Sequence, residues 1–158
     1  MLIPLAVPAS ASIVASEAAP GAVVRPVPGA VVRPFDPPEH PYGPGHRGVD
    51  LAAVEGEDVR AALDGTVVFS GTVATVGWIT LDHGGGLTTT YGPMAARVPP
   101  GTAVTAGEVI GQLALTEHLD WGARLDGDYI DPMLLLRRWT IRLTATDAVR
   151  TGQPMAVP

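Results

Sequence analysis

Glycine and proline divide this chain into short segments, and this feature constrains its fold more than any other. The 158 residues include 19 glycines and 16 prolines. Many segments between them are apolar or β-branched, which favours pleated strands over helices. Glycine turns at Asp64–Gly65 and Gly84–Gly86 each separate two such segments, as in a β-hairpin. We therefore predict a domain built mainly of short antiparallel strands.

The predicted fold class is all-β, an antiparallel β-sandwich or partly open barrel. One short helix is expected near the C-terminus, at Asp131–Arg138. Asp131 can cap it, and Pro132 suits its first position. Two arginines at its end, Arg137 and Arg138, complement the helix dipole.

The chain is expected to have three parts: residues 1–33, 34–139 and 140–158. The first is predicted to hold an export-signal-like stretch, with an A-x-A site at Ala9–Ala11, and a proline-rich linker. The linker contains GAVVRP twice, and its prolines favour an extended chain. The second part is the folded domain, and the third is a peripheral tail. No apolar run is long enough to span a membrane as a helix. The export-signal-like stretch leads us to expect a secreted or cell-envelope protein.

The composition excludes several classes of function. The formal net charge is −6 and no basic run occurs, which argues against nucleic acid as a partner. Without cysteine, a metal site must use histidine and carboxylate ligands. All basic residues are arginines. The segment VPPGTAVTAGEVIGQL is similar to the turns of lipoyl and biotinyl carriers, but the carrier role requires a lysine that the chain lacks.

The stretch GHRGVDLA places His46 and Asp50 four residues apart. On an extended segment both side chains point to the same face, and Gly48 between them permits close backbone approach. Imidazole nitrogen and carboxylate oxygen are both good zinc ligands. By spacing alone, a turn that carries two polar side chains explains the pair equally well.

A second polar cluster, EHLDWGAR, places His118 and Asp120 on one face of a predicted strand. If this strand lies beside the first segment, His46, Asp50 and Asp120 converge as a three-ligand zinc site with an open position. His118 would then lie close enough to handle protons. The alternative is a surface strand with polar residues outward and with Leu119 and Trp121 inward.

Four stretches, in order along the chain, resemble the lysostaphin/LytM-type zinc metallopeptidases of family M23. They extend from about Phe35 to Leu136, roughly two thirds of the chain. They include the H-x-x-x-D motif, the glycine-turn strands and a closing segment that reads H-x-H in the family. The stretches are GHRGVDLAAVEGEDVRAALDGTVVFSG, ITLDHGGGLTTTYGPM, VPPGTAVTAGEVIGQL and HLDWGARLDGDYIDPMLLL.

The resemblance implies a β-sandwich with a groove in which Zn²⁺ is bound. Carried over by position, His46 and Asp50 are metal ligands, and His118 is the catalytic histidine that begins H-x-H. The implied reaction is hydrolysis of peptide bonds in the peptidoglycan of the cell wall. The metal would polarise the scissile carbonyl, and His118 would orient water or transfer a proton.

Two positions depart from the family pattern. The second histidine of H-x-H is Asp120 here, which can ligate zinc but adds negative charge and so weakens the metal as a Lewis acid. A further catalytic histidine of the family is replaced by Pro93, which cannot donate to a developing oxyanion. Losing one such donor costs about 10²–10³ in rate in other enzymes.

Two functions from different classes follow. One is a metalloendopeptidase of reduced activity that cleaves peptidoglycan peptides. Tyr91 is a candidate substrate-binding phenol in its groove, and the favoured alternative for this residue is packing within its strand. The other is a catalytically inactive M23-like domain that binds cell-wall peptide or regulates another cell-wall hydrolase. The metal content of the purified protein, together with chelator-sensitive release of peptides from peptidoglycan, distinguishes the two.

Overall fold

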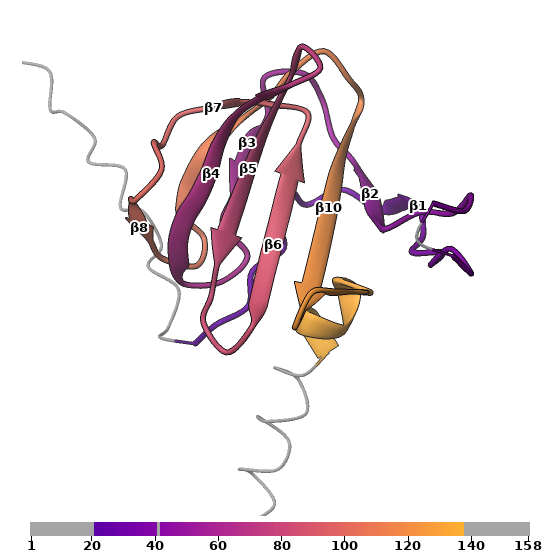
Figure 1. Cartoon of the computed structure of the whole chain (residues 1–158). Helices are drawn as coiled ribbons and strands as arrows, with labels where there is room; N and C mark the ends of the chain where they lie inside the picture. Colours follow the sequence, from indigo (N-terminus) through magenta and orange to yellow (C-terminus); the bar gives the residue numbers. More distant parts are fainter. Residues whose placement is uncertain (1–20, 41, 138–158) are drawn as a thin grey trace, which may run out of the picture.

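The computed structural model describes residues 21–40 and 42–137, which fold into two antiparallel sheets and one short helix (Figure 1). The export-signal prediction and the predicted tail at 140–158 lie outside these residues. The strands follow one another as β1 (Val31–Arg33), β2 (Gly48–Ala52), β3 (Asp58–Arg60), β4 (Gly65–Val73), β5 (Val76–Asp82), β6 (Leu87–Gly92), β7 (Met94–Ala96), β8 (Ala103–Val104), β9 (Val109–Leu113), β10 (His118–Leu125) and β11 (Asp128–Ile130).

The larger sheet has the strand order β1-β2-β10-β6-β5-β4-β8, and β11 pairs with β10 beside it. The smaller sheet has the order β3-β9-β7. All pairings are antiparallel, so the predicted all-β antiparallel fold is confirmed. The larger sheet ends in two edge strands, β1 and β8, and is therefore open rather than a closed barrel.

The core lies against the inner face of the larger sheet. Along β10 the alternate residues Leu119, Trp121 and Ala123 are buried, while the residues between them are half-buried. This period of two is the signature of a strand with one face in the core. The same face receives apolar side chains from the smaller sheet. The buried residues of both sheets include Val49, Leu51, Val59, Val67, Ile79, Leu81, Tyr91, Met94, Ile110 and Leu113.

The proline-rich segment before residue 34 is part of the fold, which corrects the prediction that it is a linker. Val27 is buried in the core, and Val31–Arg33 forms β1 on β2. A Cβ at Gly29 would lie 1.6 Å from the carbonyl oxygen of Ala52, so the backbones are closely packed there. The nearest prolines, Pro28 and Pro34, lie outside β1, so neither interrupts its pairing with β2.

The predicted helix is present at 133–137, and its cap is the one expected. The Asp131 carboxylate accepts a hydrogen bond of 2.9 Å from the backbone N–H of Met133. Arg138 lies outside the described residues. In the described part of the chain, no helix is long and apolar enough to cross a membrane.

Candidate metal centre

The pairing of β2 with β10 brings the two polar clusters of the sequence together. Asp50 and Asp120 are direct register partners, and His118 lies opposite Ala52. Paired residues of neighbouring antiparallel strands project to the same side of the sheet. Since Leu51 and Trp121 point into the core, Asp50 and Asp120 share the outer face. The structure therefore places both carboxylates where the sequence predicts them.

His46 reaches this face from the segment just before β2. An isolated bridge between Asp36 and His46 fixes its backbone. Its ring Nδ1 lies 2.9 Å from the carbonyl oxygen of Pro34, and its Nε2 lies 3.2 Å from Oδ1 of Asp50. A carbonyl can only accept, so Nδ1 carries a proton, and in the neutral ring Nε2 is a bare lone pair. A histidine that ligates metal is commonly oriented by a backbone carbonyl in this way.

The donor set fits a zinc ion. One ligand atom each from His46, Asp50 and Asp120 lies within 4.8 Å of the other two. In a tetrahedral site with bonds near 2.1 Å, ligands are about 3.4 Å apart, so small side-chain adjustments complete the geometry. Nε2 of His46 is buried without a hydrogen-bond partner. This lone pair faces a carboxylate oxygen at close range, an arrangement that a cation between them stabilises.

The electrostatics of Asp120 reflect the same crowding. Burial raises the pKa of the Asp120 carboxyl above its ordinary value, and the negative charge of Asp50 raises it further. His46, His118 and Arg33 act in the opposite direction. A divalent cation offsets both unfavourable contributions, because it favours the charged form of each carboxylate.

His118 lies beside the three donors rather than among them. Its side chain is 45% exposed, and its Nε2 is 4.0 Å from Oδ2 of Asp50. Its Nδ1 is 3.2 Å from the hydroxyl of Thr116, which orients the ring. The His118 imidazole is thus about half exposed to solvent beside three possible metal ligands.

Gly48 is required by the position of Asp120. A Cβ at Gly48 would lie 2.7 Å from Oδ1 of Asp120 and 2.7 Å from the carbonyl oxygen of Trp121. The glycine in GHRGVDLA therefore leaves room for the Asp120 carboxylate across the strand pair. The sequence indicates close backbone approach at Gly48, and the approaching groups are the Asp120 carboxylate and the Trp121 carbonyl.

Tyr91 lies in the core and not in the groove, which corrects its prediction as a substrate-binding residue. It is fully buried, and its hydroxyl accepts a 3.0 Å hydrogen bond from the backbone N–H of Ala62. The Thr89 hydroxyl donates to it at 2.8 Å. Burial raises the Tyr91 pKa to about 12. Thr89 and Tyr91 of β6 point into the core, and the β6 side chains that line the groove are those of Thr88 and Thr90.

Pro93 follows β6, next to the residue that pairs with Asp120. Gly92 is the register partner of Asp120, so Pro93 comes directly after the β6 residue that lies beside Asp120. Its carbonyl accepts a hydrogen bond from the N–H of Ala114 at 3.3 Å. Proline contributes no N–H and no polar side chain. At this position the chain therefore has no donor to offer a substrate.

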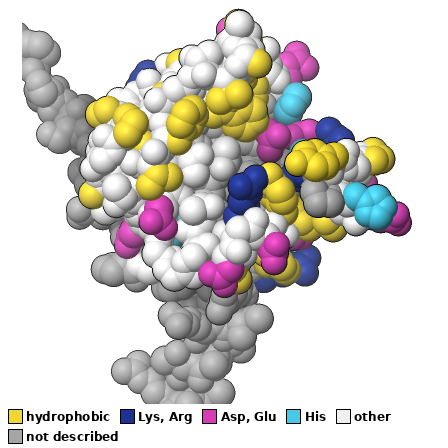
Figure 2. All heavy atoms as spheres, viewed as in Figure 1, with side chains coloured by type: hydrophobic (Ala, Val, Ile, Leu, Met, Phe, Trp, Pro, Cys, Tyr) yellow, Lys and Arg dark blue, Asp and Glu magenta, His cyan; other side chains and the backbone are white. Residues whose placement is uncertain are grey.

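A groove of about 390 Å³ continues from Asp120 along the outer face of the larger sheet. Figure 2 shows arginine side chains gathered near the middle of this face, with acidic and histidine side chains above them. The basic part of this groove depends on β11 folding back beside β10, which no local pattern in the sequence predicts. The groove is lined by Arg47, Gly48, Trp78, Thr80, Thr88, Thr90, Asp120, Gly122, Ala123, Arg124 and Tyr129.

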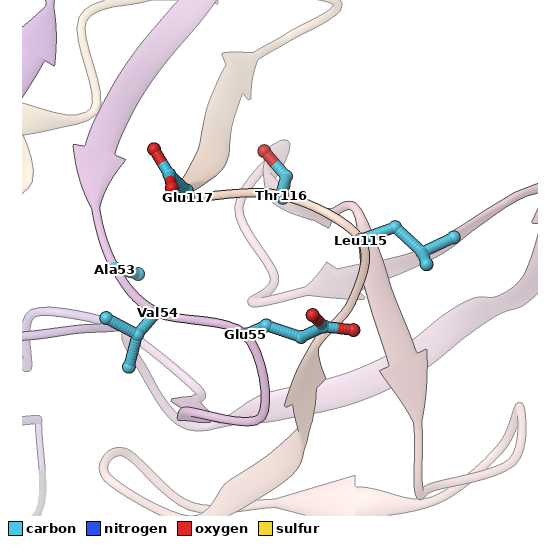
Figure 3. A pocket seen from close by; sticks show the side chains of 6 residues that line it. All are labelled: Ala53, Val54, Glu55, Leu115, Thr116 and Glu117. Carbon is cyan, nitrogen blue, oxygen red and sulfur yellow. The ribbon is translucent and has the colours of Figure 1, made fainter.

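A second hollow, of about 590 Å³, lies near the start of β10 (Figure 3). Two loops face each other across it: residues 53–55 after β2 and residues 115–117 before β10. Thr116 belongs to the second loop and also contacts His118. This hollow therefore adjoins the exposed histidine on the side opposite the groove.

Comparison with known proteins agrees with this geometry. Residues 44–132 match the sequence profile of Peptidase family M23. An uncharacterised protein of Mycobacterium tuberculosis is 42% identical over 135 residues, which are 78% of this chain and 51% of that protein. A DD-carboxypeptidase/endopeptidase, Mpg, of Neisseria meningitidis is 34% identical over 94 residues, which are 56% of this chain and 22% of that protein.

The fold is also that of a solved peptidase domain. The catalytic domain of the antimicrobial peptidase lysostaphin from Staphylococcus simulans superposes with a TM-score of 0.58 at 25% identity. The superposition covers 66% of this chain and 89% of that domain. The chain spans about half the length of the first curated relatives it matches. Since the family profile covers more than half of the chain and includes the whole metal centre, the chain belongs to peptidase family M23.

Proposed function

We propose that this domain is a zinc metalloendopeptidase that hydrolyses peptide bonds of peptidoglycan in the cell envelope, at a reduced rate. The observation that carries the proposal is the buried, bare Nε2 of His46, which faces Asp50 and lies close to a carboxylate oxygen of Asp120. Family membership and the similarity to lysostaphin support a peptidase reaction. The similarity to a DD-carboxypeptidase/endopeptidase supports a cell-wall peptide as the substrate.

In this proposal each residue has a separate role. His46, Asp50 and Asp120 hold the ion, and the Pro34 carbonyl keeps the His46 ring in the ligating tautomer. Zinc in such a site supplies Lewis-acid polarisation of a peptide carbonyl and activates water. His118 takes up and releases protons at its exposed Nε2. The groove beside Asp120 holds the peptide chain along the sheet.

The reduced rate follows from two residues. A His/Asp/Asp site carries one negative charge more than a His/Asp/His site, so it leaves less positive charge to stabilise a developing oxyanion. Pro93 supplies no second donor for that oxyanion, a loss of about 10²–10³ in rate by comparison with other enzymes. Pro93 is also the observation that favours the alternative, a metal-holding domain that binds cell-wall peptide without cleaving it.

The test combines metal content with peptide release. The purified chain is loaded with zinc, dialysed and analysed for bound metal, and then incubated with peptidoglycan while released peptides are measured by mass spectrometry. His46→Ala is expected to lose the metal and all activity. His118→Ala is expected to keep the metal but lose activity. His40→Ala is the matched control, because His40 is an exposed loop histidine.

The outcomes separate the two functions. Stoichiometric zinc together with chelator-sensitive peptide release supports the peptidase. Stoichiometric zinc with peptide binding but no release, under conditions in which lysostaphin releases peptides from its own substrate, supports the non-catalytic alternative. A wild-type protein that holds no more zinc than His46→Ala overturns both the metal site and the proposed reaction.

A further inference from the structure

The groove beside the metal centre has a basic end on the same strand as Asp120. Asp120, Gly122 and Arg124 alternate along the outer face of β10. All three line the groove. Gly122 has no side chain, so the backbone is accessible at this point of the groove. A Cβ built there would lie 3.9 Å from the nearest atoms, so the space above it is open. A peptide chain can therefore lie against the backbone between the metal centre and Arg124.

Arg124 is held in place by the hairpin that follows it. β11 folds back on β10 and pairs Arg124 with Tyr129. The Arg124 guanidinium carbon lies 4.1 Å from the centroid of the Tyr129 ring, and its Nη2 donates to the Tyr129 hydroxyl. Stacking of this kind fixes an arginine while leaving most of its N–H donors free. The guanidinium is thus oriented before any ligand arrives.

A second guanidinium contacts the same ring. Arg47 lies with its guanidinium carbon 5.7 Å from the Tyr129 centroid, and it also lines the groove. Two guanidinium groups therefore contact one aromatic ring at this end of the groove. Figure 2 shows the resulting concentration of arginine on this face.

Arg124 has no acidic partner of its own. Within residues 21–40 and 42–137, no carboxylate oxygen lies within 4.0 Å of its guanidinium. This is notable in a chain with 16 acidic and 10 basic residues, where a basic side chain has many possible partners. The Arg124 donors that Tyr129 does not use are therefore available to a ligand in the groove.

We infer that Arg124, supported by Tyr129, binds a free carboxylate of the substrate peptide. The inference rests on the proposed function, since it assigns a subsite to the same groove. Arg124 follows Asp120 by four residues on one strand, a separation of about 13 Å. An extended peptide also rises by about 3.3 Å per residue, so the recognised carboxylate lies about four residues from the bond that is cut. Arginine is suited to this role because its planar fork pairs with both carboxylate oxygens.

The test compares two forms of one ligand. Soluble muropeptides are used either with their free carboxyl groups or after conversion of those groups to amides. Binding to the zinc-loaded full chain is measured by calorimetry in a His118→Ala background, so that the ligand stays intact. The variants are Arg124→Gln and, as a matched control, Arg97→Gln, since Arg97 is exposed and does not line the groove. Metal content is measured for each protein.

We expect Arg124→Gln to weaken binding of the carboxylate form about tenfold and to leave binding of the amide form unchanged. Arg97→Gln should change neither. An equal loss for both forms would mean that Arg124 only supports the hairpin, and no loss for either would mean that it does not touch the ligand; each overturns the inference. If the wild type cleaves nothing but carboxylate-dependent binding persists, the subsite stands and the peptidase proposal fails.

Discussion

Asp50 and Asp120 face each other directly across β2 and β10, although both carry a negative charge. Like charges at paired positions destabilise a sheet, and burial adds to the cost for Asp120. Local rules of this kind are broken mainly where function requires it. We interpret the pair as a site whose stability depends on a bound cation.

Replacing Asp120 with Asn should therefore have opposite effects on stability and on metal binding. In metal-free protein, Asp120→Asn removes the repulsion from Asp50 and should raise the melting temperature by about a few degrees. Zinc affinity should fall at least about tenfold, since an amide is a poorer ligand than a carboxylate. Thermal melts in chelator and in excess zinc measure both effects. A variant less stable than the wild type in chelator would contradict this account.

The same pair predicts how metal-free stability depends on pH. The folded-state pKa of Asp120 lies above its ordinary value of 3.8, so the folded protein takes up this proton more readily than the unfolded chain. The contribution of Asp120 is thus favourable below pH 3.8 and is lost as the pH rises through the raised value. The difference between wild type and Asp120→Asn in chelator, measured by denaturant titration from pH 3.5 to 7, should grow with pH. A constant difference would mean that Asp120 does not titrate as described.

The departures from the family pattern can be reversed one at a time. Asp120→His should tighten zinc binding, because an imidazole nitrogen is a better zinc ligand than a single carboxylate oxygen. It should also raise the rate of peptide release, because one negative charge fewer leaves the metal a stronger Lewis acid. The larger ring must fit against Gly48, whose carbon lies close to the present carboxylate. Adding Pro93→His restores a donor and should increase the rate by a further factor of about 10². Steady-state release of labelled peptide measures both steps.

Comparing the single and the double variant shows which of the two departures limits the reaction. If Asp120→His raises affinity but not rate, while the double variant raises both, the missing donor at Pro93 limits the reaction. If neither variant cleaves peptidoglycan although both hold zinc, the groove does not take this substrate, and the substrate assignment is wrong.

Much of the metal centre could be predicted from the sequence, because it depends on short-range spacing. His46 and Asp50 are four residues apart on an extended segment, and His118 and Asp120 alternate on one strand. The pairing of the two segments was a condition of that prediction, and the register of β2 with β10 meets it.

The remaining features depend on contacts between distant residues. The run TTTYG alternates between the two faces of β6, but nothing local tells which parity faces the core, so the sequence leaves both a packing role and a groove role open for Tyr91. From its sequence alone the proline-rich repeat is interpreted as a linker, because its pairing with β2 at the sheet edge involves a distant segment. The basic end of the groove forms only when Arg47, which precedes β2, lies beside Tyr129 of β11.

Tyr91 has a structural role that a single substitution can isolate. Tyr91→Phe leaves the buried N–H of Ala62 without its acceptor, which should cost about 1–3 kcal/mol in the free energy of unfolding. Tyr42→Phe is the matched control, because the Tyr42 side chain is fully exposed and should tolerate the change. Urea titrations measure the difference. Peptide binding by folded Tyr91→Phe should equal that of the wild type, and a weakened affinity would return Tyr91 to the groove.

His83 predicts a second pH dependence, at higher pH than that of Asp120. Its Nδ1 lies 2.7 Å from the carbonyl oxygen of Asp64, and its Nε2 lies 2.7 Å from the hydroxyl of Thr89. Burial lowers the His83 pKa below its ordinary value of 6.5, although the hydrogen bond to Asp64 opposes this shift. The unfolded chain therefore binds this proton more readily than the folded protein.

The stability that neutral His83 contributes is present above pH 6.5 and is lost as the pH falls from there through the lowered folded-state pKa. The slope for one proton is at most about 1.4 kcal/mol per pH unit. Urea titrations in chelator between pH 7.5 and 5 should show the wild type losing more stability than His83→Gln, which cannot be protonated in this range. His40→Gln, at an exposed position, should follow the wild type. Parallel curves for wild type and His83→Gln would show that the network from Asp64 to Thr89 accommodates the charged ring.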